Sequence, residues 1–205
     1  MMRGRFITVE GIDGAGKSSH VAFLGDAIRA RGHDVVTTRE PGGTPLGEEI
    51  RELVLAETME ATTEALLLFA ARCEHVVRVI EPALARGAWV LSDRFSDATF
   101  AYQCGGRSMS RETFRALEGI VHPGLQPEVT FLFDLDPAVA YERQRARSGT
   151  PDKFEREEAL FFERVRESYL VRARVHPGRI HVVDASGSLE DVRERLAVAF
   201  TRAML

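Results

Sequence analysis

The most informative part of the sequence combines a phosphate-binding pattern with the local context that such a pattern requires. Residues 11–18 are Gly11-Ile12-Asp13-Gly14-Ala15-Gly16-Lys17-Ser18, and they match the pattern G-x-x-x-x-G-K-[ST] at every position. An apolar run that predicts a strand, residues 6–10, comes directly before them, and a helical periodicity over residues 17–31 overlaps their end. This order of strand, loop and helix is the one in which such a loop binds nucleotide phosphates.

The residue types in this loop suit the phosphates of ATP. Glycines allow backbone N–H groups to turn toward phosphate oxygens, and the N-terminus of the following helix adds partial positive charge. Lys17 can reach the β- and γ-phosphates, and the Ser18 hydroxyl is a ligand for Mg²⁺. We expect ATP to be bound by Gly11, Ile12, Asp13, Gly14, Ala15, Gly16, Lys17, Ser18 and Ser19. The alternative interpretation is a glycine-rich turn with a lysine on the surface.

The rest of the chain predicts an α/β fold. Short apolar runs rich in β-branched residues alternate with longer stretches of helical period, which is typical of parallel strands joined by crossover helices. The predicted strands are residues 6–10, 35–39, 88–92, 129–134 and 180–183. The predicted helices are residues 17–31, 62–86 and 189–203, one that begins at Pro45, and one that Asp136 caps ahead of Pro137. We expect a single domain, residues 1–205, with a five-stranded parallel sheet and helices on both of its faces.

The composition excludes several classes of protein. The chain has 205 residues, of which 44% are apolar, and a net charge of −4 from 27 basic and 31 acidic residues. These values exclude a disordered or fibrous chain and predict no general attraction to nucleic acid or to an anionic membrane. Two cysteines, Cys73 and Cys104, are too few for a disulfide framework. The sequence has no apolar run of the length that a signal peptide or a membrane span needs, so we expect neither. We expect a cytoplasmic protein that acts on small molecules and binds neither nucleic acid nor membranes.

Asp93 and Arg94 follow the third predicted strand, at the carboxyl edge of the sheet where the phosphate loop also lies. Asp93 can hold a magnesium-bound water, and Arg94 offers a rigid two-pronged donor to a second phosphate. An ion pair exposed at the strand end is the alternative. A GTPase is disfavoured, because no [NT]-K-x-D stretch occurs in the sequence. The pair predicts an acceptor molecule that carries a phosphate of its own.

Four separated motifs resemble those of the bacterial thymidylate kinases, over a region from Phe6 to about Phe200. They are the phosphate loop with Asp13 inside it, residues 38–44 (TREPGGT), residues 69–72 (FAAR) and residues 93–103 (DRFSDATFAYQ). The resemblance implies a P-loop kinase fold, phosphoryl transfer from ATP to dTMP with Mg²⁺, and a homodimer. Two alternatives remain open: another P-loop kinase that acts on a different nucleotide or nucleoside, and an ATP-binding switch or scaffold.

The resemblance also implies a set of residues that bind dTMP. They are Asp13, Arg39, Pro41, Phe69, Arg72, Arg94, Thr99 and Gln103. Asp13 is expected to accept a hydrogen bond from the deoxyribose hydroxyl; the alternative is a loop residue that faces solvent. Arg39 and Pro41 belong to a turn that is expected near the sugar and phosphate of dTMP. The alternatives are that Arg39 pairs with a neighbouring residue and that the proline belongs to an ordinary tight turn.

Two predicted helices carry the residues that are expected to contact the base. Phe69 and Arg72 share a helix face, so the resemblance implies that the ring stacks on thymine while the arginine donates to its O4. Phe69 could instead pack in the core, with Leu68 facing the base. Thr99 and Gln103 lie one helical turn apart and can offer a hydroxyl and an amide to the N3 and O2 edge of the base. The alternative is an ordinary polar helix surface.

An arginine-rich segment resembles the lid of the bacterial class of this family. Arg143, Arg145 and Arg147 precede a stretch that contains glycine and proline, and the lid is expected at about residues 143–156. Arg147 matches the principal arginine of that lid; a solvated basic helix face is the alternative. The expected catalytic residues are Lys17, Arg94, Arg147 and Asp93. Because the phosphate of dTMP is already an anionic nucleophile, direct in-line transfer needs positioning and electrostatic stabilisation rather than a strong general base.

Overall fold

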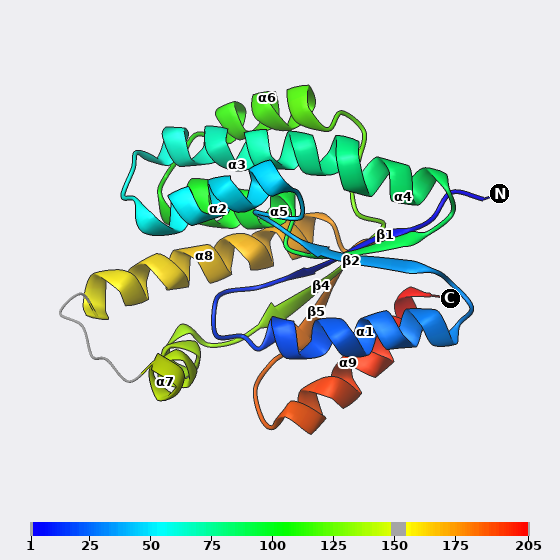
Figure 1. Ribbon diagram of the computed structural model, residues 1–205. Helices are drawn as coiled ribbons and strands as arrows, with labels where there is room; N and C mark the ends of the chain where they lie inside the picture. Colours follow the sequence, from blue (N-terminus) through cyan, green and yellow to red (C-terminus); the bar gives the residue numbers. More distant parts are fainter. Residues whose placement is uncertain (1, 149–154, 205) are drawn as a thin grey trace.

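The fold is organised around a parallel sheet at its centre (Figure 1). The computed structural model describes residues 2–148 and 155–204, with side chains for 2–146 and 159–204. The strands are β1 (Phe6–Glu10), β2 (Val35–Arg39), β3 (Trp89–Asp93), β4 (Val129–Asp134) and β5 (Ile180–Asp184). They pair in parallel in the order β2-β3-β1-β4-β5. The predicted five-stranded sheet is confirmed, with β3 displaced by one residue and β5 extended by one.

Helices cover both faces of the sheet, as expected. They are α1 (Lys17–Ala30), α2 (Pro45–Ala56), α3 (Ala61–His75), α4 (Glu81–Ala85), α5 (Ser96–Thr99), α6 (Arg111–Val121), α7 (Pro137–Ser148), α8 (Glu155–Val175) and α9 (Leu189–Ala203), with two π-helical segments, η1 (Val76–Ile80) and η2 (Phe100–Gly106). Figure 1 shows α1 and α9 on one face and α3, α6 and α8 on the other. Within the described residues, none of these helices is both long and apolar enough to span a bilayer.

Two helices differ from the prediction. The single helix expected over residues 62–86 consists of α3 and α4 joined by the π-helical turn η1. Pro82, in the first turn of α4, explains the interruption, because proline has no N–H and its ring crowds the carbonyl four residues before it. The prediction contained no helix at α6, although Ser110 caps it by accepting a hydrogen bond from Thr113 N–H, and Phe114 is buried.

Strand β1 is the centre of the sheet and leads into the phosphate loop. All five of its residues are buried, and it pairs with β3 on one side and β4 on the other. Parallel strands place their carboxyl ends at one edge of a sheet. The loop after β1, the turn after β2 and the end of β3 therefore meet at this edge, and the predicted site residues come from all three.

Candidate active site

The loop between β1 and α1 has the conformation that the sequence pattern predicts. Gly11 and Gly14 have positive φ angles of 138° and 83°, and a Cβ atom there would lie 2.4 Å from Phe133 O and 2.5 Å from Ala140 O, respectively. No side chain fits at these two positions. The loop, the start of α1 and part of α7 enclose a cavity of about 560 Å³, which we call the loop cavity. It is lined by Asp13, Gly14, Gly16, Lys17, Ser18, Ser19, Arg143, Gln144 and Ala146.

Lys17 is buried against the loop to which it belongs. Its Nζ donates to the carbonyl oxygens of Gly11 and Ile12, both at 2.9 Å, and the residue is only 6% exposed. Burial and the positive charge of Arg94 lower the pKa of Lys17 to about 8. A polyanionic ligand in the loop cavity counteracts both effects, so the site favours a ligand that brings negative charge to this ammonium group.

Ser18 and Asp93 lie together, as a magnesium site requires. The Ser18 hydroxyl donates to Asp93 Oδ2 at 3.4 Å, and the other carboxylate oxygen, Oδ1, is buried without a hydrogen-bond partner in the described part of the chain. A buried carboxylate oxygen of this kind calls for a cation or an ordered water. A serine hydroxyl and a carboxylate are oxygen groups with which proteins hold Mg²⁺ beside nucleotide phosphates, so the two residues fit the ion.

Arg94 lies between Asp13 and two tyrosines at the edge of the sheet. Its Nη2 donates to Asp13 Oδ1 at 2.7 Å and to Tyr102 OH at 3.1 Å, and its Nη1 donates to Tyr169 OH at 3.2 Å. Burial raises the pKa of Asp13, but the charges of Arg94 and Lys17 outweigh burial and hold that pKa below its usual range. The site therefore holds an ionised carboxylate directly beside the predicted phosphate-binding arginine.

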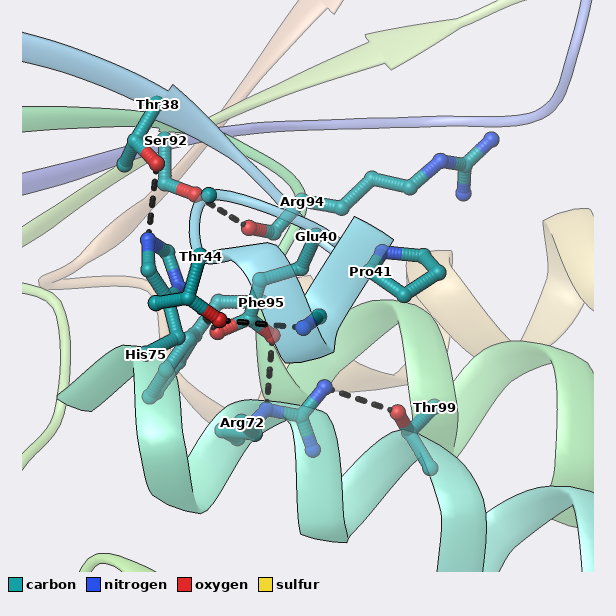
Figure 2. A network of polar contacts seen from close by, with 12 residues as sticks. Thr38, Glu40, Pro41, Thr44, Arg72, His75, Ser92, Arg94, Phe95 and Thr99 are labelled. Atoms are coloured by element: carbon teal, nitrogen blue, oxygen red, sulfur yellow. Dashed lines mark hydrogen bonds and ion pairs between the residues drawn. The ribbon is translucent and has the colours of Figure 1, made fainter. Parts of the chain in front are cut away.

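The backbone at Arg94 has an unusual conformation that three hydrogen bonds hold. Its φ angle is 76°, a left-handed value that costs a non-glycine residue about 1–2 kcal/mol. Arg94 N donates to Val9 O at 2.9 Å, Ser92 Oγ donates to Arg94 O at 2.7 Å, and Phe95 N donates to Glu10 Oε1 at 2.7 Å. The resulting turn directs the guanidinium away from the polar residues of α3 (Figure 2).

The sequence prediction did not include Glu10, Tyr102 and Tyr169, which together position Arg94. Tyr169 OH donates to Glu10 Oε2 at 2.9 Å, and Tyr102 OH donates to Asp13 Oδ2 at 3.1 Å. The Tyr102 ring also lies 4.9 Å from the guanidinium carbon of Arg94. Burial raises the pKa of Glu10 to about 8. A glutamate at the end of a mostly apolar strand is a signal in the sequence for the first of these residues. Tyr102 lies inside the motif of residues 93–103, only 8 residues after Arg94, whereas Tyr169 is 75 residues away from it.

A second cavity, of about 330 Å³, lies between the sheet edge and the helices above it. Its walls include residues of the turn after β2 and of α2, α3, α5, η2 and α8, and we call it the helix cavity. Six of the residues predicted to bind the acceptor line it: Asp13, Pro41, Arg72, Arg94, Thr99 and Gln103. Asp13 also lines the loop cavity, so the two cavities meet at this residue.

Arg39 and Phe69 do not line the helix cavity, contrary to the prediction. Arg39 forms an ion pair with Glu48 at 2.7 Å, and both side chains are largely exposed. Phe69 is buried and packs edge-on against Phe114, while the preceding residue, Leu68, lines the cavity. One residue along a helix is a rotation of about 100°, which is enough to exchange their directions. The structure thus places Leu68 where Phe69 was expected.

Two buried polar groups of the helix cavity have no hydrogen-bond partner among the residues whose side chains are described. They are Arg72 Nη1 and Gln103 Oε1. The other polar atoms of these two side chains do form hydrogen bonds. Arg72 Nη2 donates to Thr99 Oγ1 at 2.9 Å, and Gln103 Nε2 donates to Glu64 Oε1 at 3.1 Å. Unpartnered buried groups are uncommon, so a free donor and a free acceptor on residues of one cavity indicate a ligand with the complementary pair.

The predicted lid lies largely outside the described residues. The side chain of Arg147 and the whole of residues 149–154 belong to that part, so the role of Arg147 stays a prediction. Arg143, at the start of the predicted lid, donates to Ala185 O at 3.1 Å and Gly187 O at 3.0 Å. It also lines the loop cavity, so the first arginine of the predicted lid lies on the side of the phosphate loop.

Comparison with known proteins assigns the family. The family model described as thymidylate kinase matches residues 9–196. The chain belongs to the thymidylate kinase family. It is 59% identical over 194 residues to the thymidylate kinase of Bordetella petrii, which covers 95% of this chain and 93% of that protein. It is 57% identical over 195 residues to the thymidylate kinase of Methylobacillus flagellatus, with coverage of 95% and 96%.

A solved structure shows the same fold. The crystal structure of thymidylate kinase from Ehrlichia chaffeensis superposes with a TM-score of 0.80 at 31% sequence identity, and the match covers 97% of this chain and 99% of that one. The architecture that carries the two cavities is therefore that of a thymidylate kinase.

Proposed function

We propose that the protein transfers the γ-phosphate of ATP to dTMP, which gives ADP and dTDP. The observation that carries the proposal is the pair of cavities that meet at Asp13, with Lys17 lining one and Arg94 lining the other. Two anionic ligands that bind end to end need a cation for each set of phosphates. This arrangement supplies both cations and brings the reacting groups together.

ATP occupies the loop cavity in this proposal. The backbone N–H groups of residues 11–19 and the Nζ of Lys17 bind the β- and γ-phosphates. Ser18 and Asp93 would hold Mg²⁺, which neutralises phosphate charge during transfer. Arg143 lines the same cavity and adds positive charge to it.

The acceptor dTMP occupies the helix cavity. Arg72 Nη1 donates to thymine O4 and Gln103 Oε1 accepts from N3–H, which satisfies both unpartnered groups. Leu68, rather than Phe69, contributes an apolar wall for the base. Asp13 accepts from the sugar hydroxyl, and Arg94 binds the phosphate.

The reaction is a direct in-line transfer. A phosphate oxygen of dTMP attacks the γ-phosphorus, the bond from that phosphorus to the bridging oxygen breaks, and ADP leaves. Lys17, Arg94 and the lid residue Arg147 stabilise the charge on the transferred group, and Asp93 would help to hold Mg²⁺. No covalent enzyme intermediate forms, so the residues contribute by positioning, by electrostatics and by excluding water.

The test is a coupled ADP-release assay with purified protein, ATP, Mg²⁺ and a panel of nucleoside monophosphates. We expect dTMP to be turned over far faster than dCMP, dGMP or AMP. Faster turnover of another monophosphate would assign the protein to a different nucleotide kinase activity. Slow hydrolysis that no monophosphate affects would contradict the kinase proposal altogether.

We also propose that residues 1–205 form one domain and that the protein is a cytoplasmic homodimer. Exposed apolar residues support the dimer, and free thiols support the cytoplasmic location. Leu66 on α3 and Ile120 on α6 are apolar yet 52% and 76% exposed, and these helices contact each other on the outside of the molecule (Figure 1). Cys73 and Cys104 are free thiols, as a reducing compartment allows. Light scattering should give about twice the chain mass of 22.8 kDa, and a monomer would contradict the dimer.

A further inference from the structure

We propose that His75 is a positioning residue that sets the preference of the site for thymine over cytosine. His75 is not among the residues that line the helix cavity. It acts through Glu40, which holds Arg72 so that its Nη1 nitrogen faces the base. This inference rests on the proposed binding of dTMP in the helix cavity.

A chain of hydrogen bonds runs from β2 through His75 to Arg72 (Figure 2). Thr38 Oγ1 lies 2.7 Å from His75 Nε2, and His75 Nδ1 lies 2.8 Å from Glu40 Oε1. Arg72 Nε donates to the other oxygen, Glu40 Oε2, at 2.7 Å. His75, Glu40 and Arg72 are 0%, 4% and 3% exposed, so their orientations are set by one another rather than by water.

Glu40 is an ionised acceptor, and this fixes the direction of the hydrogen bonds. Burial raises the pKa of Glu40, but the charge of Arg72 and the hydrogen bond from His75 outweigh burial and keep that pKa below its usual range. An ionised carboxylate can only accept, so His75 Nδ1 must donate to it. The other ring nitrogen, Nε2, shares a hydrogen bond with Thr38 Oγ1 at 2.7 Å, and this contact orients the ring.

Another arginine pair in the molecule shows the geometry that His75 prevents. Arg166 donates from both Nε and Nη2 to the two oxygens of Asp134, at 2.6 and 2.9 Å. This two-pronged geometry is the one that arginine and carboxylate favour. At Glu40 the second oxygen is occupied by His75, so Arg72 gives only its Nε to the carboxylate, and its Nη2 bonds to a hydroxyl on α5 instead.

The result is an arginine whose Nη1 nitrogen is held in place and has no hydrogen-bond partner among the residues whose side chains are described. Besides its two bonded nitrogens, Arg72 lies against the rings of Phe69 and Phe95, at 4.7 and 5.1 Å from its guanidinium carbon. An N–H of this fixed Nη1 donates to thymine O4, but it opposes cytosine N4, which is itself a donor. Without the hydrogen bond from His75, Glu40 would form a two-pronged pair with Arg72, and the guanidinium would turn so that Nη1 no longer points at thymine O4.

Two substitutions at His75 separate its two hydrogen bonds. In His75→Asn, the amide nitrogen takes the position of Nδ1, so it can donate to Glu40 while the bond to Thr38 is lost. In His75→Gln, the longer side chain places its amide at the position of Nε2, so the bond to Thr38 is kept and the donor to Glu40 is lost. The measured quantities are kcat and KM for dTMP and for dCMP at saturating ATP, and the KM of ATP.

We expect His75→Gln to lower the ratio of kcat/KM for dTMP to that for dCMP at least about tenfold, equivalent to about 1.4 kcal/mol. The change should arise mainly from a higher KM for dTMP, with the KM of ATP unchanged. His75→Asn should keep the ratio within about threefold of the parent value. Equal losses in the two variants, an unchanged ratio in His75→Gln, or a loss confined to kcat would each overturn the proposal.

A matched control and a second variant complete the experiment. His33, which stacks on Trp89 at 4.3 Å near the amino end of the sheet, lies far from the site, so His33→Gln should leave the ratio unchanged. If His75→Gln does not fold, Glu40→Gln removes the charged acceptor directly, and an unchanged ratio in that variant overturns the proposal. If the parent protein itself releases no ADP in response to dTMP, the proposed function fails, and that result appears without any variant.

Discussion

Lys17 and Arg94 are two cations of the site, and both are held by acceptors that a phosphate can replace. Lys17 donates to loop carbonyls, and Arg94 donates to Asp13. Both side chains are already largely removed from water, with exposures of 6% and 15%. A ligand phosphate therefore meets donors that are oriented in advance, which is the condition under which electrostatic stabilisation is strongest.

Removal of Lys17 should stop phosphoryl transfer. We expect Lys17→Ala to lower kcat at least about 100-fold, because the positive charge beside the β- and γ-phosphates is lost. The coupled ADP-release assay with saturating dTMP measures the effect. Arg29→Ala, which removes an exposed cation of the same helix that pairs with Asp26, is the control and should leave kcat unchanged. Turnover of Lys17→Ala within tenfold of the parent would contradict the assignment.

Arg94 and Arg39 provide a comparison between two arginines at neighbouring strand ends. Arg94 lines the helix cavity, whereas Arg39 pairs with Glu48 outside it. Arg94→Ala should raise the KM of dTMP by about 10- to 100-fold and lower kcat as well, since a charged hydrogen-bond partner of the phosphate is lost. Arg39→Ala should leave both constants within about twofold. A larger effect at Arg39 than at Arg94 would refute this placement of the acceptor.

The titration of Glu10 should lower the free energy of unfolding as pH rises. Burial raises its pKa from the ordinary value of 4.5 to about 8, with the charge of Asp97 adding to the effect and that of Arg94 opposing it. Between these two values the folded protein keeps a proton that the unfolded chain releases. The contribution of Glu10 to the free energy of unfolding is thus present below pH 4.5 and is lost progressively up to about pH 8.

Glu10→Gln tests this dependence, because its amide does not titrate. Urea unfolding of parent and variant at about pH 5, 6.5 and 8 should show a smaller decline in the variant. Glu49→Gln, at an exposed position of α2, is the control and should follow the parent. Parallel curves for the parent and Glu10→Gln would show that Glu10 does not titrate in this range.

At the scale of elements, the packing of η2 against α8 brings Tyr102 and Gln103 toward the site. A Cβ on Gly105 would lie 2.0 Å from Ser168 Oγ, whereas a Cβ on Gly119 of α6 would meet nothing within 4 Å. Gly105→Ala should therefore lower the free energy of unfolding by about 1–3 kcal/mol. Gly119→Ala should raise it by about 0.5–1 kcal/mol, because alanine favours the helix. Urea unfolding midpoints measure both, and a stable Gly105→Ala would contradict the close approach.

The strands and the phosphate loop could be predicted because the residues that form them lie next to one another in the sequence. Val129–Asp134 is buried along almost its whole length, so the run is apolar, and the loop requires glycine at fixed positions. The direction of Leu68 and Phe69 depends on how α3 packs against Phe114, which no local pattern contains. Likewise, the bond between Tyr169 and Glu10 joins residues 159 apart in the chain.

At the scale of the whole molecule, both ligands should stabilise the fold. A ligand at about 100 times its Kd adds about 2.7 kcal/mol to the free energy of unfolding. For a chain of this size, that corresponds to a rise in melting temperature of about 5–10 °C. A thermal shift assay should show this rise with dTMP and a smaller one with dCMP at the same concentration. Equal shifts with both nucleotides would indicate that the helix cavity does not select its base.

Asp13 borders both cavities, and this has a consequence for inhibitor chemistry. A single compound could reach from the phosphate loop past Asp13 to Arg72, and it would lose translational freedom once instead of twice. Its spacer would pass an ionised carboxylate, which repels an anionic tether but accepts a hydrogen bond from a hydroxyl. An uncharged, hydroxylated spacer between a triphosphate mimic and a thymine-like head group is therefore the design that this junction favours.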